Sequence, residues 1–336
     1  MTTAPAGGDV TVNGVDVAPG ERRRIEIPVA RLPTQGNQRL TVEVVNGASD
    51  GPCLWLSAAI HGDELNGVEI IHRVLQRTEA RELSGCLLAV PIVNVFGFIH
   101  QDRYLPDRRD LNRSFPGSAT GSLASRLAHL FMTEVVERAT HGVDLHTGSL
   151  HRINLPQVRG NLDDEETRRC ALAFGAPIVI HGEAPDGSLR KAVARRGIPI
   201  IAYEAGEPQR FDEPAISMGV AGVLRLMSSL GMRDGTDDAR PGQMLEARKR
   251  SWVRARRSGI LRLEVKLGTR VKARQRIGAI EEVLGGESAP VRSPHAGIVI
   301  GHTANPLVYQ GDAVAHIARD PQPVEAWGGR DGSSRK

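Results

Sequence analysis

The chain has few cysteines and few aromatic residues. Its three cysteines, Cys53, Cys86 and Cys170, are an odd number, lie far apart and form no CxxC pair. This pattern predicts neither a disulfide framework nor a thiolate zinc site, and we interpret all three as buried thiols. Aromatic residues make up only 4% of the chain, so the interleaved aromatics expected on a nucleic-acid-binding surface are nearly absent.

Long apolar runs are also missing. No stretch of about 18 apolar residues occurs, and the N-terminus lacks a basic start followed by an apolar core. Neither a membrane span nor secretion is therefore indicated, and a cytoplasmic protein is the default expectation. The formal net charge is +4, yet residues 246–276 hold twelve Lys or Arg against two acids. We interpret that stretch as a solvated basic face, with attraction of anionic substrates and nucleic-acid binding as the alternatives.

Strand patterns alternate with helix patterns over the first two thirds of the chain. Buried strands are predicted near 54–60, 86–95, 142–146 and 198–204, and amphipathic or capped helices separate most of them. This order predicts an α/β fold with a largely parallel or mixed central sheet. After a polar segment rich in Gly and Pro, short strands without helices and an internal duplication predict a small all-β unit.

These patterns predict five segments along the chain. They are a flexible N-terminus (1–22), a catalytic α/β domain (23–233), a linker (234–250), a small β domain (251–320) and a disordered tail (321–336).

Four parts of the chain contain residues suited to chemistry: His61 with Glu64, Arg103–Arg113, His146, and Glu204. Three of them fall where a predicted strand stops, so we expect them at one edge of the sheet, where open α/β sheets bind ligands. Two His and one Glu are a common ligand set for catalytic zinc, with His61 fixed by a strand and Glu64 by the first turn of the following helix. The sequence therefore predicts metal binding by His61, Glu64 and His146.

Several further residues have predicted roles around that metal. Asp144 shares a strand face with His146 and is a candidate to orient its imidazole, with an ordinary strand-end Asp as the alternative. Glu204 follows an apolar strand and is the best candidate for a general base, ahead of Glu207, with a helix-capping or salt-bridged Glu as the alternative. Asn112 and Arg113 suit a substrate carboxylate. One of the preceding arginines could stabilise an oxyanion, the candidates being Arg103, Arg108 and Arg109.

The motifs HGDE (61–64), DLNRSFPG (110–117), DLHTG (144–148) and YEAGE, which contains Glu204, together resemble the succinylglutamate desuccinylase/aspartoacylase family, relatives of zinc carboxypeptidases. The resemblance covers roughly residues 50–230. It implies a zinc-carboxypeptidase-like mixed sheet flanked by helices and one zinc ion (Zn2+) per chain. The implied site residues are His61, Glu64 and His146 on the metal, Glu204 as general base and acid, Asn112 and Arg113 on a substrate carboxylate, and Arg103 on the carbonyl oxygen. Arg190 is the candidate for a further substrate arginine of the family.

The C-terminal β unit resembles the barrel-sandwich folds of biotinyl and lipoyl carriers. Its hairpin EEVLGGESAPV has no Lys to modify, so we do not expect a carrier role. In bacterial members of the family such a domain is expected to sit over the metal site and restrict access to small substrates.

The sequence thus predicts a zinc-dependent amidohydrolase that removes the acyl group from a small N-acyl amino acid or related carboxylate. The nearer alternative is a metallocarboxypeptidase acting on short peptides. The alternative from another class is a non-catalytic protein that binds an anionic polymer through the basic C-terminal region. The expected partner is a small carboxylate substrate rather than nucleic acid or a membrane, and the composition is compatible with a homo-oligomer.

Overall fold

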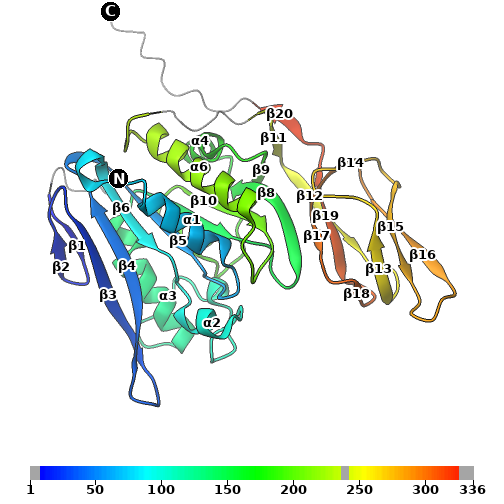
Figure 1. Ribbon diagram of the computed structural model, residues 1–336, viewed down its shortest axis with the longest axis horizontal. Coiled ribbons are helices and arrows are strands. Elements are labelled where there is room, and N and C mark those ends of the chain that lie inside the picture. The colour runs from blue at the N-terminus through cyan, green and yellow to red at the C-terminus, as the bar shows by residue number, and fades with distance from the viewer. Residues whose placement is uncertain (1–7, 236–241, 325–336) are drawn as a thin grey trace, which may run out of the picture.

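A large mixed sheet flanked by helices forms most of the protein in a computed structural model, which describes residues 8–235 and 242–324 (Figure 1). This is the predicted α/β architecture. The main path of the sheet consists, from edge to edge, of Lys249–Arg254 (β12), Ala313–Arg319 (β19), Gly297–Thr303 (β17), Arg152–Gly160 (β8), Ile200–Gly206 (β10), His141–His146 (β7), Ser49–Ala58 (β5), Ser84–Val90 (β6), Asn37–Asn46 (β4) and Arg22–Arg31 (β3). Four more strands join it at its sides: Met244–Ala247 (β11), Gln322–Val324 (β20), Ile178–His181 (β9) and Arg270–Val271 (β14).

The central strands β6, β5, β7 and β10 run parallel to one another. Their carboxyl ends therefore meet at one edge of the sheet. The register places Ala58 beside Leu145, and Glu204 beside His146. This pairing brings the ends of three predicted strands together, as the sequence predicts.

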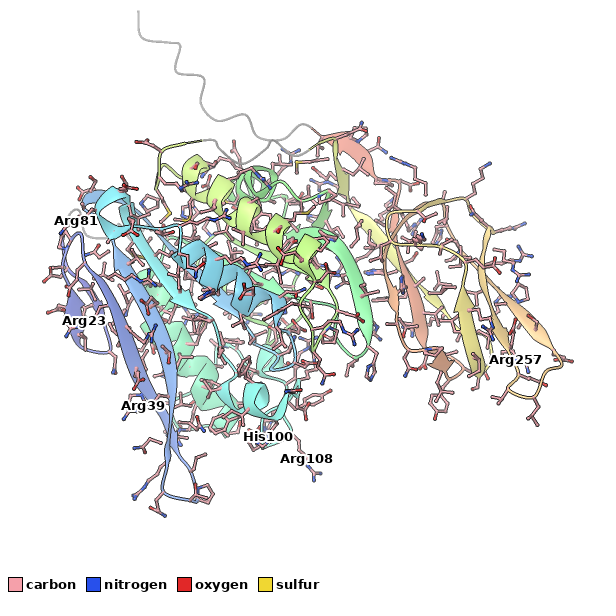
Figure 2. The ribbon with its side chains drawn as sticks, viewed as in Figure 1. Arg23, Arg39, Arg81, His100, Arg108 and Arg257 are labelled. Atoms are coloured by element: carbon pink, nitrogen blue, oxygen red, sulfur yellow. A yellow bond between two sulfur atoms is a disulfide. The ribbon has the colours of Figure 1, made fainter. Side chains whose placement is uncertain are left out.

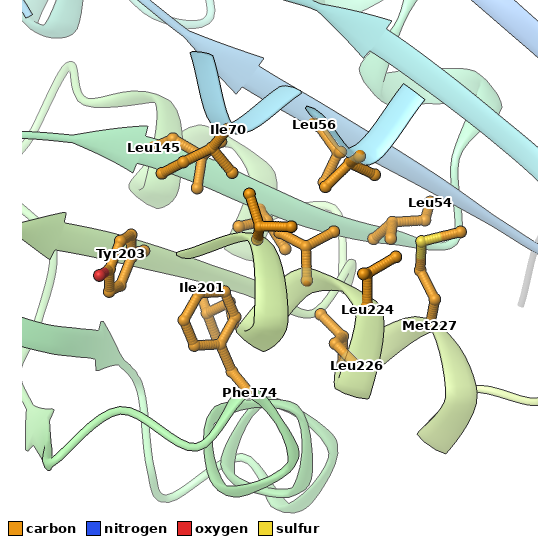
Figure 3. Close-up of a cluster of buried hydrophobic side chains, with 14 of the residues drawn as sticks. Leu54, Leu56, Ile70, Leu145, Phe174, Ile201, Tyr203, Leu224, Leu226 and Met227 are labelled. Atoms are coloured by element: carbon orange, nitrogen blue, oxygen red, sulfur yellow. The ribbon is translucent and has the colours of Figure 1, made fainter. Parts of the chain in front are cut away.

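Helices cover both faces of the sheet because the central strands are apolar on both sides. Leu54 and Leu56 of β5 face one layer, where their cluster includes Ile70, Phe174 and Leu224 (Figure 3). Trp55, between them, faces the other layer. The helices are Asn66–Leu75 (α1), Val95–His100 (α2), Leu123–Glu134 (α3), Glu165–Phe174 (α4), Leu189–Ala194 (α5) and Glu213–Ser229 (α6), with short 3-10 helices at Ala80–Glu82, Leu111–Arg113 and Val136–Arg138. Within residues 8–235 and 242–324, no helix is long and apolar enough to span a membrane.

The C-terminal strands form a two-layer β unit that continues the central sheet. One layer consists of Ser288–Arg292 (β16), Arg276–Glu281 (β15), Gly259–Leu263 (β13) and Leu307–Val308 (β18). It packs against β12, β17 and β19 through an apolar cluster that includes Val253, Ile280 and Ile317. Because β17 also pairs with β8 of the helix-flanked part of the sheet, one hydrogen-bonded sheet continues into the C-terminal β unit (Figure 1).

Strands occupy parts of the three segments that are predicted from the sequence to be a flexible N-terminus, a linker and a disordered tail. In the N-terminal segment, Val10–Val12 (β1) and Val15–Val17 (β2) form a hairpin. Its turn residues Asn13 and Gly14 both have positive φ, and this is the conformation that favours an Asn-Gly turn. Strand β11 lies in the expected linker and β20 in the expected tail, and the two strands pair with each other. Residues 1–7, 236–241 and 325–336 of these three segments lie outside the described residues.

The prediction of three free thiols is wrong. Cys53 and Cys86 form a disulfide, and Cys170 is the buried free cysteine. The two bonded residues lie on the neighbouring parallel strands β5 and β6, where they are paired in register with Cα atoms 4.4 Å apart. The two cysteines are 33 residues apart in sequence, and only the pairing of β5 with β6 brings them together. The spacing of cysteines in the sequence therefore did not predict the disulfide.

Candidate metal centre

His61, Glu64 and His146 meet at the carboxyl edge of the central strands. Strand β5 ends at Ala58, and the chain then makes a turn in which the Glu64 N–H donates to the His61 carbonyl over 3.2 Å. The sequence predicts Glu64 in the first turn of the helix. Helix α1 begins only at Asn66, so Glu64 instead lies in the turn before the helix. His146 is the last residue of β7. One potential ligand atom from each of the three lies within 4.8 Å of the others.

Both imidazoles direct Nδ1 at the carboxylate of Glu64. The distance from Nδ1 of His61 to Oε1 is 2.7 Å, and that from Nδ1 of His146 to Oε2 is 2.8 Å. The Ser149 hydroxyl donates to Oε1 over 2.6 Å, and the Thr147 N–H donates to Oε2 over 3.1 Å. All three potential ligands are buried, so the group is held rigidly and shielded from solvent.

A carboxylate also lies at the far nitrogen of each imidazole. Nε2 of His146 is 2.7 Å from Asp144, which in turn accepts a hydrogen bond from the Ser57 hydroxyl over 2.6 Å. This is the contact proposed for Asp144 from its strand position. Nε2 of His61 is 3.5 Å from Asp110, a partner that the sequence reading missed although Asp110 opens the DLNRSFPG motif. Metal-binding histidines are commonly oriented by such carboxylates.

The carboxylates around His61 and His146 favour a positive charge, a proton or a metal ion, between the imidazoles and Glu64. Burial alone would lower the pKa of both histidines, but the carboxylates outweigh it: Glu64 and Asp110 raise the pKa of His61, and Asp144 and Glu64 raise that of His146 well above its usual range. Burial would raise the pKa of Glu64, yet the two imidazoles hold it well below the usual value. Without an ion, protons must therefore lie between these groups.

A divalent cation fits the same position. With neutral imidazoles, three carboxylates contact the two rings, those of Glu64, Asp110 and Asp144. Among the described residues the arginine that forms an ion pair with any of them is Arg103, which binds Asp110 at 2.7 Å and lies 4.0 Å from Glu64. Three carboxylates paired with one arginine leave an excess of negative charge that a doubly charged ion would reduce. Two imidazole nitrogens and a carboxylate are also the donor types of catalytic zinc sites.

The candidate metal centre opens into a polar cavity of about 350 Å³. Arg103 lines this cavity, and its guanidinium donates to the Ser149 hydroxyl over 2.7 Å. Arg108 and Arg109 are exposed on the same loop and are not among the lining residues, and Arg108 points away from the protein (Figure 2). Of the three arginines considered for the oxyanion, Arg103 is thus the one beside the metal centre.

Asn112, Arg113 and Arg190 also line the cavity. The side-chain oxygen of Asn112 accepts a hydrogen bond of 2.9 Å from the Leu189 N–H at the start of α5, which places the following residue, Arg190, nearby. The amide nitrogen of Asn112 has no hydrogen bond to any described residue. Burial lowers the pKa of Arg190 to about 10, so its guanidinium stays charged at neutral pH.

Glu204 faces the same cavity from β10. Its Oε1 lies 2.7 Å from Arg159, and its Oε2 accepts a hydrogen bond of 2.7 Å from the Asn154 amide. Both partners belong to β8, and the sequence analysis does not predict this strand. The apolar residues of RINLPQVRG do alternate in part with polar ones, but Pro156 interrupts the pattern and argues against an internal strand.

Comparison with known proteins finds a matching family and a similar enzyme. Residues 50–230 match the family described as the succinylglutamate desuccinylase/aspartoacylase catalytic domain. The N-alpha-acetyl-L-2,4-diaminobutyric acid deacetylase of Halomonas elongata is 29% identical over 307 residues, covering 88% of this chain and 90% of that protein.

Solved structures also resemble most of the chain. A succinylglutamate desuccinylase/aspartoacylase from Rhodobacter sphaeroides has a TM-score of 0.80 at 27% identity, covering 89% of this chain and 95% of that one. The product-bound ectoine utilization protein EutE (DoeB) from Ruegeria pomeroyi has a TM-score of 0.82 at 23% identity, covering 95% and 100%. Because the family match extends over more than half of the chain and includes His61, Glu64 and His146, the chain belongs to the succinylglutamate desuccinylase/aspartoacylase family.

Proposed function

We propose that this chain is a zinc-dependent amidohydrolase that removes the acyl group from a small N-acyl amino acid or related carboxylate. The main support is the arrangement of two buried imidazoles among three carboxylates, next to a cavity that also contains Glu204. His61, Glu64 and His146 would hold one zinc ion. The similarity to a named deacetylase over most of both chains supports amide hydrolysis, and the size of the cavity suits a small molecule.

The polar groups nearest the candidate metal position then have defined tasks. When bound, zinc would activate a water molecule and polarise the amide carbonyl. The Glu204 carboxylate, held by Arg159 and Asn154, accepts a proton from the attacking water and delivers it to the leaving amine. The guanidinium of Arg103 donates to the oxyanion that forms on the carbonyl oxygen. Because Asp110 and Ser149 already fix this guanidinium, little reorganisation is needed.

The carboxylate of the substrate is recognised by Asn112, Arg113 and Arg190. The amide nitrogen of Asn112 and the two guanidinium groups supply donors suited to a planar carboxylate. Arg190 gives the strongest support, because its Nη1 is buried without a hydrogen-bond partner. Leaving a buried guanidinium nitrogen without a hydrogen bond is unfavourable, and a bound carboxylate would supply the missing acceptor.

The test replaces Glu204→Gln and compares it with Glu207→Gln. Glu207 is the nearby alternative base, and it pairs with Arg210. We expect the first variant to lose about a thousandfold in kcat while keeping one zinc per chain, and the second to keep both activity and zinc. The measurements are amine release from a panel of N-acyl amino acids and metal content. Full activity of Glu204→Gln would remove Glu204 from the mechanism, whereas zinc-free protein without hydrolysis of any substrate would refute the function.

A further inference from the structure

The segment that follows His146 contains two consecutive residues in an unfavourable backbone conformation. Leu150 and His151 have φ values of 54° and 60°, in the left-handed region that residues with a β-carbon rarely adopt. Leu150 lacks the short polar side chain that makes this region accessible to Asn and Asp. Such a conformation persists only where the surrounding contacts impose it, so the shape of this segment depends on the groups that hold residues 147–152.

The same segment presents Ser149 to the candidate metal centre. The Ser149 hydroxyl donates to Oε1 of Glu64 over 2.6 Å and accepts a hydrogen bond of 2.7 Å from Nη1 of Arg103. It thus bridges a proposed metal ligand and the guanidinium proposed to bind the oxyanion. Because both contacts use one hydroxyl, a shift of the Ser149 backbone would weaken both of them.

The segment folds back on itself, so that its two ends lie close together. The Gly148 N–H donates to the carbonyl of Gly206 over 3.0 Å, which ties the beginning of the segment to β10. A β-carbon on Gly148 would lie 2.1 Å from the carbonyl oxygen of Arg152, and only glycine permits that approach. The Arg152 N–H also donates to the carbonyl of Ser149 over 3.2 Å. The position of Arg152 therefore influences that of Ser149.

The C-terminal β unit holds the end of the segment. Strand pairing places Thr303 of β17 opposite Arg152 of β8. Next to this pair, the Ala304 N–H donates to the carbonyl of His151 over 2.7 Å. The Arg152 guanidinium lies over the ring of Trp252 in β12, with its Cζ 5.2 Å from the ring centre. A cation in this position is attracted by the face of the ring, so Trp252 keeps the side chain of Arg152 in place.

Trp252 rests on a second ring in the neighbouring strand. It is paired in register with His316 of β19, and the two rings stack at 4.0 Å and 9°. Burial, together with nearby arginines, lowers the pKa of His316 to about 3, so its ring is neutral and does not repel Arg152. The two stacked rings thus give Arg152 a fixed, uncharged surface.

We propose that Trp252 is a positioning residue for the reaction, and that it acts through Arg152 on Ser149. Held in this way, the Ser149 hydroxyl keeps Arg103 oriented beside Glu64. The C-terminal β unit then supports the reacting groups and does more than border the cavity. The proposal rests on the proposed function, from which Arg103 and Glu64 take their roles, and it assigns no substrate contact to Trp252.

The first experiment tests Ser149 in the zinc-loaded full chain, with the N-acyl amino acid that the wild type hydrolyses fastest. Ser149→Ala removes both hydrogen bonds of the hydroxyl and should lower kcat by about tenfold to a hundredfold with little change in KM. Ser149→Thr keeps a hydroxyl and should retain most of the rate. Wild-type kcat in Ser149→Ala would overturn the proposal, because Trp252 would then have no catalytic contact on which to act.

The second experiment tests Trp252 with the same substrate. Trp252→Ala should lower kcat by about threefold to tenfold, and Trp252→Phe, which keeps an aromatic ring, should restore most of the loss. The control is Tyr309→Ala. Tyr309 is 67% exposed in the same β unit and lies outside the cavity, so its substitution should leave kcat unchanged.

A double-mutant cycle distinguishes action through Ser149 from direct contact of Trp252 with the substrate. If Trp252 acts through Ser149, adding Trp252→Ala to Ser149→Ala should change kcat by less than about twofold, because the position of the missing hydroxyl no longer matters. Direct contact would instead give independent effects that multiply. Multiplying effects, or wild-type kcat in Trp252→Ala, would overturn the proposal while leaving the deacylase function intact.

Hydrogen exchange tests the support of the segment without turnover. In metal-free protein, the N–H groups of Arg152 and Ala304 should exchange about tenfold faster in Trp252→Ala than in the wild type, and Tyr309→Ala should match the wild type. Mass spectrometry of peptides that contain these two residues measures the rates. If Trp252→Ala speeds exchange but no N-acyl amino acid is hydrolysed, the support of the segment stands and the function is wrong. Unchanged exchange in Trp252→Ala refutes that support whatever the activity.

Discussion

The two ends of strand β7 each contribute a histidine to a group of three potential metal ligands. His146, at its carboxyl end, meets His61 and Glu64, and His141, at its amino end, meets Glu166 and Cys170. In both groups the potential ligand atoms lie within 4.8 Å of one another. Distance alone therefore does not distinguish them, although only the first group lies among the family's motifs.

The surrounding charge does distinguish them. Arg169 binds both oxygens of Glu166 and also hydrogen-bonds Ser229, so the carboxylate at the amino end is already neutralised. Burial raises the pKa of Cys170 to about 12, which keeps its thiol protonated, and burial lowers the pKa of His141. The group at the carboxyl end instead has three carboxylates at its imidazoles and, within the described residues, one arginine that forms an ion pair with them, Arg103. An excess of negative charge, in addition to suitable donors within reach, makes a site ready for a cation.

The largest expected difference in zinc content and activity is between the His→Ala variants at the two ends of β7. His146→Ala removes a proposed metal ligand and should abolish zinc retention and lower activity by about a thousandfold or more, because metal catalysis contributes several kcal/mol. His141→Ala should keep one zinc per chain and near wild-type activity. Metal content and amide hydrolysis of the two purified variants check this. Loss of zinc from His141→Ala, or its retention in His146→Ala, would reverse the comparison.

A smaller difference is expected from the carboxylates beside the two imidazoles. Asp144→Asn weakens the acceptor at Nε2 of His146, 2.7 Å away, and should lower zinc affinity by about tenfold to a hundredfold. Glu166→Gln changes the acceptor at Nε2 of His141, 3.0 Å away, and should leave zinc affinity unchanged. Competition with a chelator at fixed pH measures both. Equal affinities in wild type and Asp144→Asn would show that Asp144 does not support the metal ligand.

The sequence predicted the carboxyl-end group because local signals were sufficient there. His61, His146 and Glu204 each follow an apolar strand pattern, and parallel strands bring such ends to one edge. The partners of these residues depend on contacts that no local pattern reveals. Asn154 and Arg159 reach Glu204 only because β8 pairs antiparallel with β10.

Other misses share the same physical origin. The disulfide requires two strands to pair in register, and Trp252 enters the cavity only because the C-terminal strands extend the central sheet. The N-terminal hairpin is different, since its Asn-Gly turn between alternating valines was a readable signal. Side-chain partnerships across a sheet thus remained hidden, while the residue types of the metal centre were recognisable.

The smallest expected effect concerns stability at the amino end of the strand. Arg169 lowers the pKa of Glu166 from 4.5 to about 2, against burial, and His141 adds to the shift. Because the folded pKa is depressed, this carboxylate stabilises the protein fully above pH 4.5, and the contribution is lost as the pH falls toward 2. The side chain is 39% exposed, so solvent screening limits the contribution to about 1 kcal/mol.

Urea denaturation of metal-free protein can isolate that contribution. At pH 7 the free energy of unfolding of Glu166→Gln should be about 1 kcal/mol below that of the wild type, and at pH 3 more than half of the gap should have closed. Glu165→Gln is the matched control, since Glu165 is an exposed neighbour in the same helical turn and its substitution should produce no such closing gap. A gap that stays constant or widens between pH 7 and pH 3 would mean that Arg169 does not hold Glu166 ionised, and the amino-end group would then lose the feature that sets it apart from the metal centre.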